Sequence, residues 1–332
     1  MEIMSQTMKA AVVVRAGAPE VLEVQRIPRP EAREGWTLVE VKAFGLNRSE
    51  LQTRQGHSPS VRFPRVLGIE CVGVVAETRD PDMAVGTTVA AVMGEMGRAF
   101  DGGYAEYALL PTSLLMPLET KLDWPVLGAL PETYLTAHGS LEALDIREGC
   151  TRLLIRGGTS SLGLAALALA KHRFGLTVAT TTRNPSKVAA LRALGADHVL
   201  LDRGDIAQRT FDVFPEGADY VLELMGANTV PESLRLVRRG GVVCSTGRVN
   251  GIWTIPDFDP VAMIPSGAKL TAFHSNDAKG AAGAGTLQAI VSDVEAGRYG
   301  AHLDRAFPLD EIAEAHRYME ENRATGKVVG VP

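Results

Sequence analysis

The chain has 332 residues, 45% of them hydrophobic, and its 39 acidic side chains outnumber 34 basic ones to give a formal net charge of −5. This composition allows a large buried core, so it excludes an intrinsically disordered chain. An acidic balance also argues against binding to nucleic acid or to an anionic membrane, because both are bound through dense Lys and Arg.

The first part of the chain, from Lys9 to about Leu118, consists of short β-like runs separated by turns that contain Gly and Pro. Many short strands with this punctuation predict a compact, barrel-like β domain. The opening residues Met1–Thr7 are either a frayed leader or an early start of the first strand. The expected strands are Ala10–Arg15, Val21–Ile27, Thr37–Ala43, Gly68–Glu77, Thr87–Met93 and Tyr104–Leu110.

The rhythm changes after Pro125, where apolar strands alternate with helical stretches. This alternation implies right-handed crossovers and a parallel, doubly wound sheet. The length agrees with two domains of about 100–200 residues each. The expected strands are Leu153–Arg156, Thr177–Thr182, His198–Leu201, Tyr220–Leu224, Val242–Thr246 and Lys269–His274, and the expected helices are Ser161–His172, Pro185–Leu194 and Val230–Arg239, the last ended by Gly240-Gly241.

The last part of the chain has two amphipathic helical stretches, Gly285–Ala296 and Asp310–Asn322. A final short strand is expected at Lys327–Val331. The segment Ala278–Gly285 is rich in Gly and Ala, and it is predicted to be a mobile connection.

The three cysteines, Cys71, Cys150 and Cys244, are odd in number and far apart in the sequence. They can build neither a disulfide framework nor a four-cysteine zinc lobe. The longest apolar run, Leu162–Ala170, has nine residues, whereas a membrane helix needs about 20. The first residues, which include Glu2, also argue against a secretory signal. These features predict a soluble, cytoplasmic protein.

The most informative segment is a strand that runs into a glycine-containing turn and then into a helix. Phosphate binding needs small residues there because the backbone must approach the pyrophosphate, while the helix N-terminus supplies unpaired N–H groups. Ser160 stands where G-x-G-x-x-G has its central glycine, so an ordinary structural turn is the alternative. The predicted nucleotide-binding residues are Gly157, Gly158, Thr159, Ser160, Ser161, Leu162 and Gly163.

The choice of cofactor is expected about 20 residues further on, where NAD sites usually place an acidic residue. The second strand here ends in Thr180-Thr-Thr-Arg-Asn-Pro-Ser-Lys187, without Asp or Glu. Arg183, Lys187 and the hydroxyl of Thr182 suit a 2′-phosphate instead, because a guanidinium binds phosphate as a fork and an ammonium adds a point charge. The predicted cofactor is NADP(H); the alternative is that Arg183 and Lys187 are a solvated helix start.

With this turn placed after a β domain, the sequence from Met8 to Pro332 resembles the medium-chain dehydrogenase/reductase superfamily. The resemblance implies an α/β fold with a GroES-like catalytic domain, residues 1–124 and 277–332, around an inserted Rossmann domain, residues 125–276, and a cofactor cleft between them. The motifs that carry it, in order, are Lys9-Ala-Ala-Val-Val13, Gly45-Leu-Asn-Arg-Ser-Glu50, Pro64-Arg-Val-Leu-Gly-Ile-Glu-Cys-Val-Gly-Val-Val75, Gly102-Gly-Tyr-Ala-Glu-Tyr107, Leu130-Pro-Glu-Thr-Tyr-Leu-Thr-Ala-His-Gly139 and Thr325-Gly-Lys-Val-Val329.

Zinc-containing relatives carry a cysteine where this chain has Asn47 and a histidine where it has Ile69. Two of three ligands are thus replaced by groups that cannot form the Cys/His site of catalytic zinc, and Glu132, near the third position, cannot hold zinc alone. Only Gly94–Gly103 stands in the place of the structural four-cysteine lobe. The chain therefore most resembles the zinc-free quinone oxidoreductases, the group that includes ζ-crystallin, and no metal site is expected.

The resemblance also implies roles for single residues. Asn47 would lie at the nicotinamide as a cofactor-binding and catalytic residue that donates to a developing oxyanion, and a loop-capping asparagine is the alternative. Gln52 replaces a frequent tyrosine and is the predicted substrate-binding residue. The other implied cofactor contacts are Thr136 at the phosphates, Gly226, Gly247 and Phe273 at strand ends over adenine and nicotinamide, and Lys327 as the tail lysine of the cleft.

Two carboxylates beside these residues, Glu50 and Glu70, are either acid/base groups or paired structural carboxylates. Arg54 is the expected partner of Glu70. The resemblance implies an NADPH-dependent oxidoreductase that transfers hydride to quinones or α,β-unsaturated carbonyls without a metal, as a homodimer with Lys269–His274 near its seam. The alternative is an NADPH-binding protein with little catalysis, in a crystallin-like or RNA-binding role.

Overall fold

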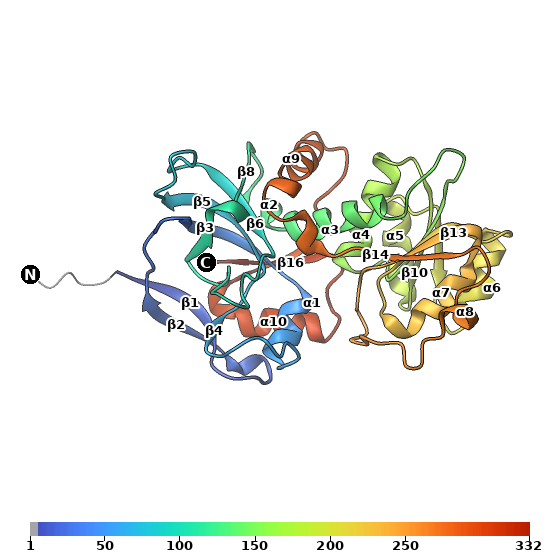
Figure 1. The fold of residues 1–332 in the computed structure, drawn as a ribbon, viewed down its shortest axis with the longest axis horizontal. Coiled ribbons are helices and arrows are strands. Elements are labelled where there is room, and N and C mark those ends of the chain that lie inside the picture. Colours follow the sequence, from blue (N-terminus) through green and yellow to red (C-terminus); the bar gives the residue numbers. More distant parts are fainter. Residues whose placement is uncertain (1–5) are drawn as a thin grey trace, which may run out of the picture. The chain divides into compact units, whose positions relative to one another are not determined.

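The computed structural model describes residues 6–332 of the chain. The chain forms two compact units: one contains the chain up to Leu135 and again from Ser275, and the other runs from Thr136 to His274. The first unit is therefore assembled from segments far apart in sequence, coloured blue to green and red in Figure 1, and the second is an insertion. The division falls inside helix α3 (Pro131–Glu142). The predicted domain boundaries at 124/125 and 276/277 stay a prediction.

Two β-sheets form the frame of the first unit. Its strands are β1 (Thr7–Val13), β2 (Leu22–Pro28), β3 (Trp36–Leu46), β4 (Arg65–Val66), β5 (Glu70–Glu77), β6 (Thr88–Val92), β7 (Tyr107–Pro111), β8 (Met116–Pro117), β15 (Leu303–Pro308) and β16 (Lys327–Val331). The smaller sheet has the order β2-β1-β4, and the larger has β15-β16-β3-β5-β6-β8 with β7 also on β3. Because β3 pairs antiparallel with both β5 and β16, it joins early and late parts of the sequence.

The helices of the first unit are α1 (Arg48–Arg54), α2 (Trp124–Gly128), α9 (Ala281–Glu295) and α10 (Ile312–Glu320). Its core contains Phe44 of β3, which packs on Tyr104 with ring centroids 4.7 Å apart. The hydroxyl of Tyr104 lies 3.2 Å from Nε2 of His316 in α10, which gives the buried phenol a polar partner. This packing fixes the end of β3, where the first group of candidate residues begins.

The second unit is built on one parallel sheet. Its strands are β9 (Arg152–Arg156), β10 (Thr177–Thr182), β11 (His198–Leu201), β12 (Ala218–Glu223), β13 (Val237–Ser245) and β14 (Lys269–Ala272), and its helices are α4 (Ser161–His172), α5 (Val188–Ala193), α6 (Ile206–Val213), α7 (Val230–Leu236) and α8 (Pro260–Met263). The order is β11-β10-β9-β12-β13-β14, and all neighbours are parallel. The predicted doubly wound parallel sheet is confirmed.

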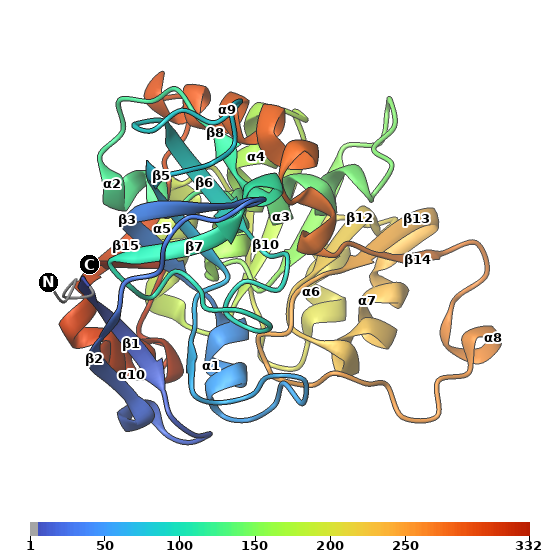
Figure 2. The same cartoon turned by 60° about the vertical axis from the view of Figure 1, so that its left-hand side comes forward.

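The order of this sheet reverses between β9 and β12. Ligands of open α/β sheets bind outside the carboxyl ends of the strands at such a switch point. On one face of the sheet α6 and α7 lie side by side, as Figure 2 shows, over an apolar core that includes Leu154 of β9 and Val221 of β12. The ends of β9 and β12 are therefore the expected position of a nucleotide.

The helix predicted at Val230–Arg239 is too long. The helix ends at Leu236, and Gly240 and Gly241 lie inside strand β13. A Cβ at position 241 would be 2.7 Å from Cβ of Val237 and 2.9 Å from the carbonyl oxygen of Asp219. The glycine pair therefore serves the close passage of β13 along β12 and does not end the helix.

The mobile connection predicted at Ala278–Gly285 is also wrong, because α9 begins at Ala281. Gly283 is buried in this helix, and a Cβ there would lie 2.0 Å from the carbonyl oxygen of Ala278. Of the opening segment, residues 1–5 lie outside the described residues, and Thr7 is the first residue of β1. In residues 6–332 no helix has the length and apolar composition needed to cross a membrane.

Candidate functional site

The first group of candidate residues gathers where β3 ends. Asn47 follows β3, Glu50 lies in α1, Glu70 begins β5 and Lys327 begins β16; these four residues are called the β3-end cluster. They meet because β5 and β16 flank β3 on either side. The ammonium of Lys327 lies 2.6 Å from Oε1 of Glu70 and donates to Oδ1 of Asn47, also at 2.6 Å. Nδ2 of Asn47 donates to Oε1 of Glu70 at 2.9 Å.

The ion pair in this cluster is fully buried, with Lys327 1% and Glu70 0% exposed. A buried pair is tolerated only where further hydrogen bonds satisfy its remaining polar atoms. Oε2 of Glu70 accepts the backbone N–H of Glu132 at 2.9 Å, so both oxygens have partners. A Cβ at Gly45 would lie 2.1 Å from Oε1 of Glu70, and glycine at this position therefore leaves the room that the ion pair occupies.

Glu50 is the other buried carboxyl of the cluster. Its Oε1 accepts the backbone N–H of Ile69 at 3.2 Å and Nδ2 of Asn47 at 3.3 Å, while Oε2 has no hydrogen-bond partner among residues 6–332. Burial raises the pKa of Glu50 to about 8, against the opposing effects of the Ile69 N–H and of Lys327. Glu50 therefore carries its proton at neutral pH.

The amide of Asn47 is oriented by these neighbours. Both of its N–H groups face carboxyl oxygens and its carbonyl oxygen faces an ammonium; the reverse orientation would set two donors 2.6 Å apart. Asn47 is the N-cap residue of α1, but its side chain makes no capping hydrogen bond. Glu70 does not pair with Arg54 as expected, since Arg54 pairs with Glu320 and Glu70 with Lys327.

The donor set at this place does not fit a catalytic zinc ion. Ile69, which stands where the resemblance places a histidine ligand of zinc-containing relatives, is apolar and buried. The cation beside Glu70 is the Lys327 ammonium. In the part of the chain that the structure describes, no three His, Cys, Asp or Glu side chains are placed to hold a metal ion. The buried carboxylate of Glu70 is thus already paired with a cation of the protein.

The second group of candidate residues forms the turn after β9. Gly157 has a φ of +93°, which favours glycine, and a Cβ at Gly158 would lie 1.8 Å from Oγ1 of Thr180. Gly163, in the first turn of α4, would place a Cβ 2.5 Å from the carbonyl oxygen of Gly157. The backbone of α4 therefore packs directly against the backbone of the turn. Glycines allow the same close approach in dinucleotide-binding turns.

Ser160 shapes this turn from within. Its hydroxyl donates to the carbonyl oxygen of Gly157 at 2.8 Å and accepts the N–H of Gly163 at 3.0 Å, so its one proton is already used. The N–H groups of Ser161 and Leu162, in the first turn of α4, have no partner among the described residues. They and the helix dipole point to an anion, and these residues fit a dinucleotide pyrophosphate.

The end of β10 carries the residues predicted to choose the cofactor. The hydroxyl of Thr182 accepts the N–H of Asn184 at 3.1 Å and so holds the turn that follows the strand. Arg183 is exposed, and Lys187 is half-buried at the start of α5. An acidic residue, Asp202, is bonded to this end of β10, since its N–H donates to the carbonyl oxygen of Thr182 at 2.9 Å. Arg183 is thus the first residue after β10, and its guanidinium is exposed.

The remaining predicted residues are spread over both units. Gly226 and Gly247 follow β12 and β13, where a Cβ would lie 2.0 Å from Oδ1 of Asn250 and 2.5 Å from the carbonyl oxygen of Leu224, respectively. Phe273 lies against α3, where a Cβ at Gly139 would be 2.1 Å from its ring. Two further predicted residues are Thr136, buried in α3, and Gln52, half-buried in α1.

Known proteins resemble this chain over nearly its whole length. Residues 33–120 match the model of the alcohol dehydrogenase GroES-like domain, and residues 194–329 match a model described as zinc-binding dehydrogenase. The chain is 27% identical to the NADPH-dependent alkenal/one oxidoreductase, chloroplastic, of Arabidopsis thaliana, over 98% of this chain and 80% of that protein. It is 29% identical to the quinone oxidoreductase of Homo sapiens, over 97% of each chain. A mycobacterial protein solved in complex with NADPH is 25% identical with a TM-score of 0.84, over 98% of this chain and all of that one.

Proposed function

Because this chain is an oxidoreductase of the medium-chain dehydrogenase/reductase family, we propose that it uses NADPH to reduce quinones or α,β-unsaturated carbonyl compounds without a metal. The observation that carries the proposal is the glycine turn after β9 followed by a β10 end with Arg183 and no acidic residue. A relative named as NADPH-dependent and another protein solved with NADPH support the same cofactor.

The cofactor would be held by residues of the second unit. The N–H groups of Ser161 and Leu162 would bind the pyrophosphate, and Arg183 with Lys187 would bind the 2′-phosphate. The proposed cofactor contacts Thr159, Gly226, Gly247, Phe273 and Thr136 rest on the resemblance. When bound, the reduced nicotinamide supplies a hydride, which is what a quinone or an activated alkene accepts.

Replacing Arg183 by alanine is expected to weaken NADPH binding roughly ten- to a hundredfold and to leave NADH binding within about twofold, because only NADPH offers the charge-assisted hydrogen bonds of a 2′-phosphate. Fluorescence titration with both cofactors measures this. Arg192→Ala, which removes an exposed guanidinium from α5, is the matched control and is expected to change neither affinity. Equal affinity of the unmodified protein for NADPH and NADH would refute the cofactor assignment.

Asn47 is the proposed catalytic residue. The bond from its Nδ2 to Glu50 is the longer of its two donated bonds, 3.3 Å against 2.9 Å to Glu70, and Glu50 is neutral at pH 7. A substrate oxygen that gains negative charge is a better acceptor than a neutral carboxyl, so it can take this N–H. Lys327, which donates to Oδ1, polarises the same amide in the favourable direction.

Asn47→Ala is expected to lower kcat with quinones and enones roughly a hundredfold while the Kd for NADPH changes less than about threefold. Steady-state assays and a titration separate the two quantities. Gln52→Ala, one turn along α1, is expected to raise KM for the acceptor with little change in kcat, since Gln52 is the proposed substrate contact. Unchanged turnover in Asn47→Ala would remove its catalytic role, and NADPH binding without turnover in the unmodified protein would favour a non-catalytic binding protein.

Zinc independence is part of the proposal. It is supported by Asn47 and Ile69 in place of ligands and by the Lys327 ammonium beside Glu70. Stoichiometric zinc in active, purified protein would contradict it.

The proposed homodimer would use β14, which lies at the edge of its sheet and exposes Leu270, because unpaired strand edges invite pairing.

A further inference from the structure

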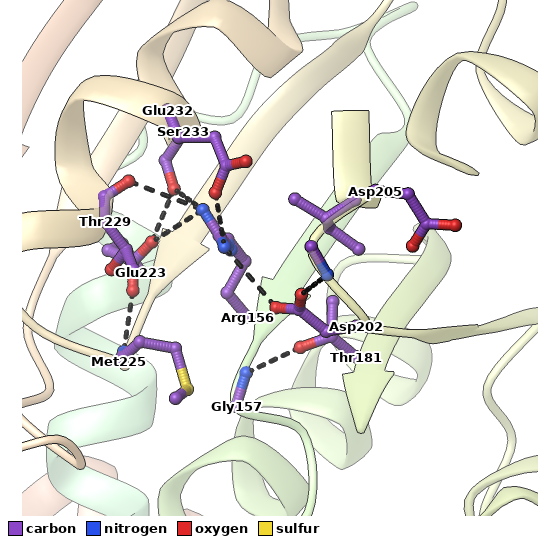
Figure 3. Close-up of polar contacts among 12 residues, drawn as sticks. Arg156, Gly157, Thr181, Asp202, Asp205, Glu223, Met225, Thr229, Glu232 and Ser233 are labelled. Carbon is purple, nitrogen blue, oxygen red and sulfur yellow. Dashed lines mark hydrogen bonds and ion pairs between the residues drawn. The ribbon is translucent and has the colours of Figure 1, made fainter. Parts of the chain in front are cut away.

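Arg156 is the last residue of β9 and directly precedes the glycine turn. Its side chain is 2% exposed, and its guanidinium lies among three carboxylates, which Figure 3 shows around it. The distances are 2.8 Å from Nη2 to Glu232, 3.5 Å from Nη2 to Asp202 and 3.6 Å from Nη1 to Glu223. These four residues are called the Arg156 cluster. Three acidic side chains therefore share one buried cation.

The Arg156 cluster lies at one end of the apolar face of the sheet. Side chains alternate between faces along a strand, so Arg156 points the same way as Leu154, and Glu223 the same way as Val221. The two strands are in register there, with Glu223 opposite Arg156. The apolar core under α7 thus ends at the carboxyl ends of β9 and β12. The charged groups of the cluster follow there, at the switch point of the sheet.

Hydrogen bonds tie the cluster to the segments on both sides of the switch point. Nη1 of Arg156 donates to the hydroxyl of Ser233 in α7 at 2.9 Å, and that hydroxyl donates to Oε2 of Glu223. Oε1 of Glu223 accepts the N–H of Met225 at 2.6 Å, one residue before Gly226. On the turn itself, the N–H of Gly157 donates to the hydroxyl of Thr181 at 3.0 Å. Arg156, which directly precedes the turn, is thus connected through Ser233 and Glu223 to the segment after β12.

The charges of the Arg156 cluster affect how strongly the turn after β9 can bind an anion. The dipole of α4 offers about half a positive charge at the phosphate turn. Three carboxylates against one guanidinium already leave the cluster net negative, and loss of Arg156 would remove its one positive charge. Burial raises the pKa of Glu223, while the charge of Arg156 opposes that rise. The guanidinium therefore reduces the repulsion that the carboxylates at this edge of the sheet exert on a phosphate.

We propose that Arg156 is a positioning residue for the cofactor phosphates: it offsets part of the negative charge of its cluster and holds the turn after β9 against the segment after β12. The inference rests on the proposed function in that the phosphates belong to NADPH. It adds a residue that touches no cofactor atom and acts through its neighbours.

The test compares both ends of β9. Arg152, at the amino end, makes a similar cross-strand pair with Asp219 of β12, at 3.2 Å, away from the turn. Arg156→Met is expected to raise the Kd for NADPH about tenfold or more, the order expected for one uncompensated charge in a partly buried site. Arg152→Met is expected to leave that Kd within about twofold, although both variants lower the unfolding midpoint. Arg156→Lys is expected to restore most of the affinity.

Charge neutralisation gives a second readout, which a merely structural role would not move. Asp202→Asn is expected to tighten NADPH binding about threefold in the otherwise unmodified chain, and to recover affinity when combined with Arg156→Met. This readout stands even if Arg156→Met does not fold. The inference is overturned if Arg156→Met binds NADPH like the unmodified protein, if Arg152→Met loses as much affinity, or if Asp202→Asn changes nothing. A chain that prefers NADH contradicts the proposed function only, and the comparison is then made with NADH, which has the same pyrophosphate.

Discussion

Replacing Lys327 by methionine is expected to destabilise the folded chain by about 3–5 kcal/mol, because the change leaves a fully buried carboxylate without its cation. Lys327 is the ion-pair partner of Glu70 at 2.6 Å and also holds Oδ1 of Asn47. Urea unfolding of the two proteins gives the difference in the free energy of unfolding. The same variant is expected to lose turnover, because Asn47 loses the group that orients it.

Two further proteins make this result specific. Lys9→Met breaks an exposed pair of similar length, 2.8 Å to Asp310, and is expected to cost less than about 1 kcal/mol. The double variant Lys327→Met with Glu70→Gln removes both charges and is expected to be more stable than Lys327→Met alone. Similar losses of unfolding free energy in Lys327→Met and Lys9→Met would show that burial does not determine how much the Lys327–Glu70 pair stabilises the fold.

The pH dependence of stability is expected to change when Glu50 is replaced by glutamine. The pKa of Glu50, about 8 in the folded chain, lies above its ordinary value of 4.5, so the folded state holds a proton that the unfolded state releases. The contribution of Glu50 is fully present below about pH 4.5 and is lost as the pH rises through about 8. Relative to Glu50→Gln, the unmodified protein should therefore lose at most about 1.4 kcal/mol of unfolding free energy per pH unit between pH 5 and 8.

Denaturant unfolding at pH 5, 6.5 and 8 measures this difference. Glu23→Gln, on an exposed part of β2, is the matched control, and its difference from the unmodified protein is expected to stay within about 0.5 kcal/mol over the range. A difference between the unmodified protein and Glu50→Gln that does not vary with pH would mean that Glu50 is ionised throughout. The proposed release of the Asn47 N–H to substrate would then lose its support.

The sequence predicted those parts of the molecule that depend on neighbouring residues. Helix Ser161–His172 and strand Thr177–Thr182 have the predicted bounds, because their periodicity and their flanking glycines are local signals. The same kind of local signal predicts the glycine turn. Gly240-Gly241, by contrast, resembles a helix stop locally, and only the approach of β13 to β12 explains it.

The parts of the site that were missed depend on long-range pairing. Glu70 and Lys327 are 257 positions apart, and no local pattern distinguishes Lys327 from Arg54 as the partner. Nor could the sequence show that the hydroxyl of Ser160 is used inside its own turn. Arg156 offered one signal: a charged residue at the end of an apolar strand, directly before two glycines, needs buried partners. The identity of those partners follows only from the register of β9 and β12.

The pairing of β3 with β16 also determines when the first unit can be completed during synthesis. Glu70 and its strand β5 leave the ribosome long before Lys327, and the whole inserted unit is translated between them. Until β16 arrives, the buried position of Glu70 has no cation and the larger sheet lacks two of its strands. The inserted unit has no such dependence, because all strands of its sheet are consecutive in the chain. Nucleotide binding is therefore expected to appear on the nascent chain before the β3-end cluster exists.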